Sequence, residues 1–410
     1  MSNVIQASLV VTVTLLLAGC AVESTGVAAD TRPDVPVDGG VKGGFPLPAD
    51  PDASAPATPD ATPSCAPGPG GDAADPIAAP VGEWTFVDVP GSRCMNGSAT
   101  GFGVNPGASS ELLVYFEGGG ACFDPVTCLA VGHAGGFGAA ELAPAVKGLT
   151  DGILSRTDPR NPYRDWSFVF VPYCTGDVHA GDNPSGPGGR AHVGFENVRH
   201  LLARVVPAYA SADRVLVSGS SAGGFGAAYN FDQIARAFAC TRARVDLLDD
   251  AGIPMGDAYL KPCLQALWRD TWGLERTLPK DCPECGAGER GGLGAVLPFL
   301  ARKYPASRFA YLSATQDLTI RTFFGFGFSD RCASLSLMDG PLFEAGLLDV
   351  RTRILGGLPN AAVYAVAGFS ALQHTFLGDP IGKTTTAGIP LDAWLGTFNA
   401  GDSRWQSEGP

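Results

Sequence analysis

One run of sixteen residues constrains the fold of this chain more than any other feature. Residues 214–229 read RVLVSGSSAGGFGAAY, which is an apolar strand pattern, a glycine-rich turn around Ser221 and a run of small residues typical of a helix. A G-x-S-x-G turn between a strand and a helix holds its serine on a sharp bend with the hydroxyl exposed. The glycines leave room for that bend, and the helix N-terminus favours negative charge. The run predicts Ser221 as a nucleophile, and the alternative is a tight glycine turn with a solvated serine.

Short apolar runs rich in β-branched and aromatic residues recur on both sides of this turn. Stretches with helical spacing of apolar residues lie between them, at residues 195–206 and 231–238. Such alternation predicts an α/β fold with a mostly parallel central sheet and helices on both faces, as in α/β-hydrolases, with ligands at the carboxyl ends of the strands. The expected strands are residues 111–116, 166–172, 214–218, 245–248, 309–313 and 362–367.

A serine hydroxyl needs a base to remove its proton, and in α/β-hydrolases this histidine follows the serine in the chain. Only one of the five histidines, His374, follows Ser221, and it comes just after the last expected strand. We therefore expect His374 to be the base. The alternative is a histidine that only packs or lies on the surface.

An acid between the serine and the histidine must orient the imidazole. Asp317 follows the expected strand at residues 309–313, whereas Asp249 and Asp250 follow the strand directly after the elbow. The acid of this fold usually follows the second strand after the nucleophile, which favours Asp317. Asp250 is the alternative, and both Asp249 and Asp250 could instead serve only in loop hydrogen bonds near the site.

Backbone amides must stabilise the oxyanion that forms when a serine attacks a carbonyl. The expected strand at residues 111–116 runs into a glycine loop, EGGGAC at residues 117–122, of the type that lines such a site. We expect the amides of Gly119, Gly120 and Ala222 to be the donors. A phosphate-binding loop is the rival interpretation of any glycine run, but no Lys followed by Ser or Thr comes after it.

The N-terminal eighty residues differ in composition from the rest of the chain. Residues 1–19 contain an apolar run too short to span a bilayer and end in Leu-Ala-Gly before Cys20, a pattern similar to a bacterial lipoprotein signal peptide. A plain secretory signal is the alternative. Residues 20–80 are dominated by Pro, Ala, Asp and Gly and predict a disordered tether. The catalytic domain is expected to cover residues 81–405.

Charge and processing signals narrow the expected partners. A net charge of −13 argues against a nucleic-acid partner and against binding to an anionic membrane surface. We expect an exported monomer whose contact with a membrane is limited to a lipid on Cys20, located in the cell envelope or, without the lipid, secreted. No metal or cofactor is expected, because the predicted chemistry needs neither.

The ten cysteines that remain after Cys20 are an even number, which in an exported chain predicts disulfides. Their connectivity does not follow from the count. The pair Cys282 and Cys285 has the spacing of a zinc or redox motif, but no second C-x-x-C or histidine-rich segment lies nearby. We therefore predict a structural disulfide for this pair.

Seven blocks of sequence, taken in order, resemble the pectin acetylesterase and Notum carboxylesterase family over residues 85–380. The resemblance implies hydrolysis of oxygen esters by Ser221, Asp317 and His374 without a metal. The blocks are RCMNGS (93–98), EGGGAC (117–122), PYCTGD (172–177), GSSAGG (219–224), DAG (250–252) and the neighbourhoods of Asp317 and His374.

The resemblance also implies two disulfides, Cys94–Cys174 and Cys122–Cys128. This chain has Gly120 where the family's glycine loop usually carries a tryptophan that would wall the acyl pocket. The expected function is removal of O-acyl groups, preferably O-acetyl groups from polysaccharide. The alternatives are hydrolysis of longer acyl esters and a catalytically silent carbohydrate-binding lipoprotein. Aromatic and polar loop residues around Trp268, Trp272 and residues 323–326 are candidates for shaping the acyl or sugar subsite, and the alternative is that they only pack the lid.

Overall fold

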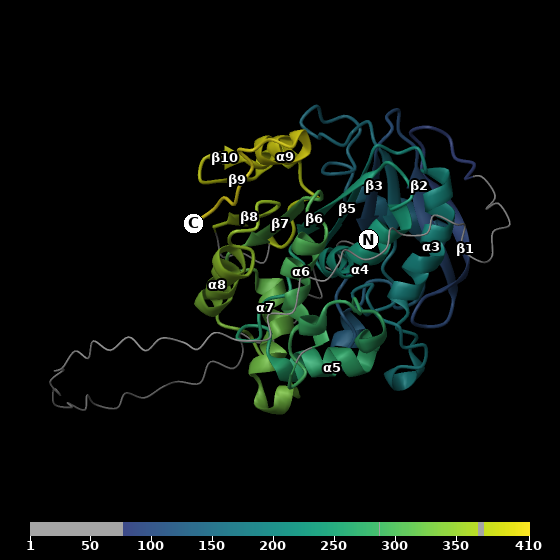
Figure 1. Ribbon diagram of the computed structural model, residues 1–410. Coiled ribbons are helices and arrows are strands. Elements are labelled where there is room, and N and C mark those ends of the chain that lie inside the picture. The colour runs from purple at the N-terminus through teal and green to yellow at the C-terminus, as the bar shows by residue number, and fades with distance from the viewer. Residues whose placement is uncertain (1–76, 287, 368–372) are drawn as a thin grey trace, which may run out of the picture. The chain divides into compact units, whose positions relative to one another are not determined.

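The computed structural model describes residues 77–286, 288–367 and 373–410 (Figure 1). The predicted signal peptide, the lipidation site Cys20 and the predicted tether up to residue 76 lie outside the described residues. In the described part of the chain, no helix is long and apolar enough to cross a bilayer.

An eight-stranded sheet forms the centre of the fold, in the order β1-β2-β4-β3-β5-β6-β7-β8. β2 pairs antiparallel with β1 and β4, and every other neighbouring pair in the sheet is parallel. The predicted mostly parallel sheet is therefore confirmed. The strands are β1 (Thr85–Arg93), β2 (Ala99–Asn105), β3 (Leu112–Phe116), β4 (Ser167–Val171), β5 (Arg214–Ser220), β6 (Arg244–Asp250), β7 (Phe309–Ala314) and β8 (Ala361–Val366), with a separate small pair, β9 (Thr385–Thr386) and β10 (Ile389–Pro390).

Helices cover both faces of this sheet, as Figure 1 shows for α3, α4 and α6 in front of the strands. Successive residues of a strand point to opposite faces, so Val215 and Val217 enter one apolar core with α3, α4 and α6 while Leu216 enters another with α2 and α9. Burial on both faces explains why the parallel strands are continuous apolar runs. The helices are α2 (Ala139–Lys147), α3 (Gly194–Ala208), α4 (Ala222–Phe238), α5 (Pro262–Trp272), α6 (Val296–Lys303), α7 (Leu318–Gly325), α8 (Gly340–Asp349) and α9 (Leu391–Ala400).

β1 and β2 were not among the expected strands, and the reason lies in close packing. β2 contains two glycines where a side chain would collide with its neighbours. A Cβ at Gly101 would lie 1.9 Å from the Val87 carbonyl oxygen, and one at Gly103 would lie 2.4 Å from the Leu142 side chain on α2. The glycines that allow this packing also remove the apolar pattern by which a strand is recognised.

Four disulfides join cysteines within the described residues, and Cys240 is also disulfide-bonded. Two of the four are the pairs implied by the family resemblance, and a third joins Cys282 to Cys285. They are Cys94–Cys174, Cys122–Cys128, Cys263–Cys332 and Cys282–Cys285.

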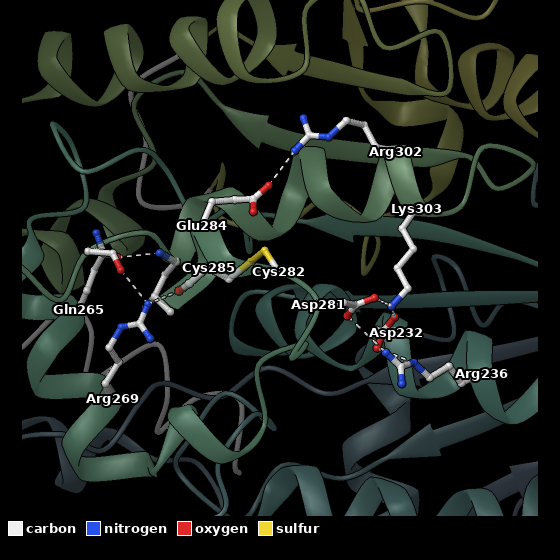
Figure 2. The surroundings of a disulfide bond; sticks show 12 residues. Asp232, Arg236, Gln265, Arg269, Asp281, Cys282, Glu284, Cys285, Arg302 and Lys303 are labelled. Atoms are coloured by element: carbon white, nitrogen blue, oxygen red, sulfur yellow. Dashed lines mark hydrogen bonds and ion pairs between the residues drawn. A yellow bond between two sulfur atoms is a disulfide. The ribbon is translucent and has the colours of Figure 1, made fainter. Parts of the chain in front are cut away.

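The Cys282–Cys285 disulfide lies on a short turn between α5 and α6 (Figure 2). Both sulfurs are consumed by the disulfide, so this pair is not a zinc site. Within the ranges that the structure describes, no three His, Cys, Asp or Glu side chains are grouped to hold a metal ion. The turn is fastened to its surroundings by Arg269, which donates to the Cys285 carbonyl oxygen, and by the ion pairs Glu284–Arg302 and Asp281–Lys303.

Candidate active site

Ser221 lies at the bend between β5 and α4, as the sequence run predicted. Its backbone has φ 59° and ψ −123°, a left-handed conformation that is rare for a residue with a side chain. The flanking glycines make this bend sterically feasible. A Cβ at Gly219 would lie 2.2 Å from the Gly223 carbonyl oxygen, and one at Gly223 would lie 2.0 Å from the Phe116 carbonyl oxygen. Ser221 is thereby held, half-buried, at the N-terminus of α4.

Asp317 and His374 come together at the carboxyl edge of the sheet. Asp317 follows β7 and caps α7, because its Oδ1 accepts from the Ile320 amide at 2.9 Å. Its Oδ2 lies 2.7 Å from Nδ1 of His374, which follows β8. An ionised carboxylate can only accept hydrogen bonds, so the proton of a neutral His374 sits on Nδ1 and the lone pair is on Nε2.

The surroundings of His374 set its basicity. Burial lowers the pKa of its imidazole, but the charge and hydrogen bond of Asp317, with a contribution from Asp250, outweigh this and raise the pKa above the ordinary value. The side chain of Asp317 is fully buried, whereas 16% of the His374 side chain is exposed. A base held in this way stabilises the imidazolium that forms on proton transfer.

Asp250, the alternative acid, takes a different position from Asp317. Its carboxylate accepts from the amides of Phe376 and Leu377, at 2.9 and 3.0 Å, and not from the imidazole of His374. Its carbonyl oxygen accepts from the Ser221 amide at 2.7 Å. Asp250 thus links the backbone of Ser221 to the backbone of Phe376 and Leu377, shortly after His374, whereas in the described residues the Ser221 hydroxyl makes no hydrogen bond to His374.

The glycine loop (residues 117–122) follows β3 and lies directly against the elbow. A Cβ at Gly118 would lie 2.6 Å from the Ser220 carbonyl oxygen, and one at Gly120 would lie 2.8 Å from the Ala130 carbonyl oxygen. Gly120 has φ +84°. The loop therefore has to be glycine-rich both to turn and to approach Ser221 this closely.

A small cavity beside Ser221 brings together two of the three predicted oxyanion donors. Gly120 and Ala222 line it with Ser221, whereas Gly119 does not. The Gly119 carbonyl oxygen accepts from the Gly132 amide at 3.1 Å, and its α-carbon faces the ring of Tyr173. The arrangement thus offers the backbone amides of Gly120 and Ala222 next to the hydroxyl.

The whole cavity has a volume of about 20 Å³. Apart from Ser221, Gly120 and Ala222, the residues that line it are apolar. Of the aromatic residues expected near the site, Trp268 and two of residues 323–326 line it, but Trp272 does not. Trp272 is fully buried, and its Nε1 donates to the Cys122 carbonyl oxygen at 2.8 Å, so it supports the glycine loop from behind. The apolar lining consists of Ala121, Val178, Phe225, Trp268, Ile320, Phe323 and Phe324.

Three side chains that the sequence analysis did not single out hold the glycine loop. Glu117 places Oε1 3.1 Å from Nε2 of His133 and accepts the Tyr173 amide on Oε2 at 2.9 Å. Nε2 of His179 lies 2.9 Å from the Glu117 carbonyl oxygen. Burial lowers the pKa of His179 to about 4, so it is neutral and donates. The position of Glu117 directly before three glycines was the only sequence signal for this network.

The fold and these side chains define an α/β-hydrolase with an elbow serine, amides beside it and a carboxylate-paired histidine. Comparison with known proteins then gives the family. The Pectinacetylesterase family model matches residues 80–289, which is 210 of 410 residues and about half of the chain. The chain belongs to the pectinacetylesterase family, whose curated relatives are carboxylesterases.

Individual relatives share segments of this chain. Palmitoleoyl-protein carboxylesterase notum1 of Xenopus laevis is 33% identical over 171 residues, 39% of this chain and 32% of that protein. Pectin acetylesterase 11 of Arabidopsis thaliana is 29% identical over 208 residues, 47% of this chain and 51% of that protein. The chain thus spans between about a third and a half of these relatives.

A solved structure shows the same fold over a longer stretch. The Wnt deacylase Notum from Drosophila superposes with a TM-score of 0.56 at 18% sequence identity, over 77% of this chain and 92% of that chain. The similarity therefore reaches beyond the stretch that the family model matches, which ends before Asp317 and His374.

Proposed function

We propose that this protein is a serine esterase that removes O-acetyl groups, with acetylated polysaccharide as its substrate. The single observation that carries the proposal is the buried Asp317–His374 pair, 2.7 Å apart, on the same sheet edge as the strained elbow of Ser221. A serine, a carboxylate-paired histidine and preorganised amides are the parts that acyl transfer to a serine requires.

The proposed reaction runs through an acyl-enzyme. The hydroxyl oxygen of Ser221 attacks the ester carbonyl while Nε2 of His374 accepts the hydroxyl proton. The amides of Gly120 and Ala222 donate to the oxyanion, and Asp317 stabilises the imidazolium. The bond between the acyl carbon and the sugar oxygen then breaks, and His374 gives its proton to that oxygen, which leaves as a hydroxyl. In the second half, His374 deprotonates a water that attacks the acyl carbon, and Ser221 leaves with the proton as acetate is released.

The cavity beside Ser221 supports a small acyl group. The walls of the cavity next to the Ser221 hydroxyl are apolar, which suits the methyl group of an acetyl ester. Gly120 offers no indole to wall the cavity, but Trp268 on α5 and Phe323 on α7 line it with aromatic rings. A long fatty acyl chain, the group named for the palmitoleoyl-protein relatives, would need these rings to move.

Acetate release from a panel of acetylated glycans tests this function. We expect release by the wild type and none above background by Ser221→Ala. Release that persists in Ser221→Ala would exclude the mechanism. A wild type that folds but neither releases acetate nor reacts with a fluorophosphonate would favour the catalytically silent binding protein.

Chain-length preference separates the short-acyl proposal from hydrolysis of longer esters. We expect p-nitrophenyl acetate to be cleaved with a higher kcat/KM than the octanoate ester. Phe323→Ala, which opens the cavity, should raise kcat/KM for octanoate relative to that for acetate. The control is Leu337→Ala at a residue that is 40% exposed, and it should leave this ratio unchanged. A wild type that strongly prefers octanoate would overturn the deacetylase proposal.

The location proposed for the protein is the cell envelope. The disulfides of the described chain indicate folding in an oxidising compartment outside the cytosol. Lipidation of Cys20 after removal of residues 1–19 would tether the domain to a membrane. Cys20→Ala or globomycin treatment should leave an unprocessed precursor, and normal processing in both would exclude the lipoprotein.

A further inference from the structure

We propose that Asp250 is a positioning residue for ester hydrolysis, clamping the histidine loop (residues 373–377) to the nucleophile elbow through its side chain and backbone. This inference rests on the proposed function, because it assigns a role in bringing His374 to Ser221. It adds a second, fully buried carboxylate that acts through backbone amides and not through the imidazole.

The clamp is a continuous set of hydrogen bonds across four segments that are distant in the sequence. The hydroxyl of Tyr115 on β3 donates to Oγ of Ser220 at 2.8 Å, and Oγ of Ser220 donates to Oδ2 of Asp250 at 2.7 Å. The same oxygen, Oδ2, also accepts from the Phe376 amide at 2.9 Å and from the Leu377 amide at 3.0 Å, and Oδ1 lies 3.1 Å from the Phe376 amide. Phe376 comes two residues after His374, so its hydrogen bond to Asp250 holds in place the backbone that carries the imidazole.

Sheet register explains why this residue is able to reach both sides. Ser220 and Asp250 are paired in the parallel β5–β6 ladder, at the last position of each strand. The neighbouring Asp249 points to the opposite face, where its Oδ1 accepts from the Gly252 amide at 2.8 Å and lies against Gly224 of α4. Of these two adjacent aspartates, therefore, only Asp250 directs its side chain to the histidine loop.

The carboxylate also affects the charge of the site. Burial raises the pKa of Asp250 to about 6, although the hydrogen bonds from Leu377, Phe376 and Ser220 oppose this. When ionised, Asp250 contributes to the raised pKa of His374. Other titratable or charged groups near this pair are Tyr115, Glu117, Asp249, Asp317 and Arg321.

The variant Asp250→Asn tests the clamp, since it keeps the shape but replaces one acceptor oxygen by a donor and removes the charge. We expect kcat for p-nitrophenyl acetate at pH 8 to fall about 100-fold, as a displacement near 1 Å in a reacting group can cause, with KM unchanged. The control Asp249→Asn changes an equally buried neighbour that touches neither loop, and it should leave kcat within about twofold of the wild type.

A pH profile separates this role from a merely structural one. Wild-type Asp250 becomes protonated, and so resembles asparagine, as the pH falls through about 6. The ratio of wild-type to Asp250→Asn kcat should therefore be largest near pH 8 and shrink toward pH 5. The rising limb of the variant should also lie at lower pH, because loss of the negative charge lowers the pKa of His374. A pH-independent ratio, or wild-type kcat in Asp250→Asn, would overturn the proposal.

Two further measurements keep the result interpretable. If Asp250→Asn does not fold, Tyr115→Phe serves as the second variant, because it removes only the hydrogen bond from Tyr115 to Ser220. We expect it to reduce kcat by about 3- to 10-fold, as the loss of one such bond would. An unchanged kcat in Tyr115→Phe would count against the clamp. Fluorophosphonate labelling of the wild type at Ser221 reports the proposed function separately. No labelling of the folded wild type refutes that function, whereas normal labelling with an unaffected Asp250→Asn refutes only the clamp.

Discussion

The two loops that flank Ser221 are held by different chemistry. The histidine loop is fixed by hydrogen bonds to buried carboxylates, those of Asp317 and Asp250. The glycine loop is held by the Glu117 network and, in addition, by covalent links, since Cys122 is bonded to Cys128 and its amide donates to Gly176, two residues after the Cys94–Cys174 disulfide. Both loops therefore depend on a carboxylate, but of the two only the glycine loop contains a disulfide.

This difference follows from what each loop must do. In the proposed mechanism the imidazole of His374 changes its charge during the reaction, so its neighbours have to be groups that respond to that charge. The amides of Gly120 and Ala222, the proposed oxyanion donors, keep their protons and only have to stay in place. We therefore expect carboxylate substitutions to have the larger effect on the histidine-loop side, and the loss of disulfides to act mainly on the glycine-loop side.

The largest effect is expected on the histidine-loop side. Asp317→Asn retains an oxygen that can cap α7, but it can stabilise the wrong tautomer of His374 and carries no charge. By analogy with other serine hydrolases, kcat for p-nitrophenyl acetate should fall about 10⁴-fold. The matched control is Asp339→Asn at the start of α8, which is exposed and should be silent. A loss of less than tenfold in Asp317→Asn would remove Asp317 from the mechanism.

The contrast between the loops also shows what the sequence could and could not predict. Chain order and the positions of strand ends singled out Ser221, His374 and Asp317, because parallel strands place their carboxyl ends at one edge. The same reasoning offered Asp250 only as an alternative acid or as a loop hydrogen-bonding residue, and it did not indicate which loop. Its contact with Phe376 joins residues 126 positions apart, and no local pattern encodes it.

The supports of the glycine loop were hidden from the sequence for a similar reason. Glu117, His133 and His179 meet only because β3 and β4 are neighbours in the sheet. The central strands were predictable from apolar runs, whereas β2 was not, since its glycines serve packing against α2. Local patterns thus indicated the proposed reacting groups but not the residues that hold them.

A large effect on stability is expected when the Cys94–Cys174 disulfide is removed. It closes a loop with a sequence separation of 80 residues, and the chain-entropy model assigns about 4 to 5 kcal/mol of unfolding free energy to a loop of this length. Cys282→Ala with Cys285→Ala is the matched control, because a separation of three residues predicts only about 2 kcal/mol. Urea denaturation of both double variants measures this, and equal losses would contradict the loop-length argument.

A smaller effect on catalysis is expected from Glu117→Gln. The amide side chain has one acceptor oxygen where the carboxylate has two, so it can accept the Tyr173 amide but not also a proton donated by Nε2 of His133, and it removes the negative charge beside that imidazole. The glycine loop should shift, and kcat should fall about 10- to 100-fold as the amide of Gly120 moves away from the oxyanion. Glu196→Gln on α3, whose carboxylate pairs only with Arg199 among the described residues, should retain wild-type kcat. Full activity in Glu117→Gln would show that the disulfides alone hold the loop.

The smallest effect concerns Asp249, which borders the clamp but touches neither loop. Burial raises the pKa of its carboxyl well above the ordinary value. A carboxyl with a raised pKa in the folded state stabilises the fold most below its unfolded pKa of about 4, and this stabilisation is lost as the pH rises through the folded value. Asparagine does not ionise, so the unfolding free energy of Asp249→Asn relative to the wild type should increase from pH 5 to pH 8. Urea denaturation at both pH values measures this difference, while the pH profile of kcat should stay that of the wild type. A shifted kcat profile would mean that a third carboxylate, beyond Asp317 and Asp250, affects the titration of the site. Asp249 lies against Gly224 of α4, so the pH response would then not be confined to the contacts of the histidine loop.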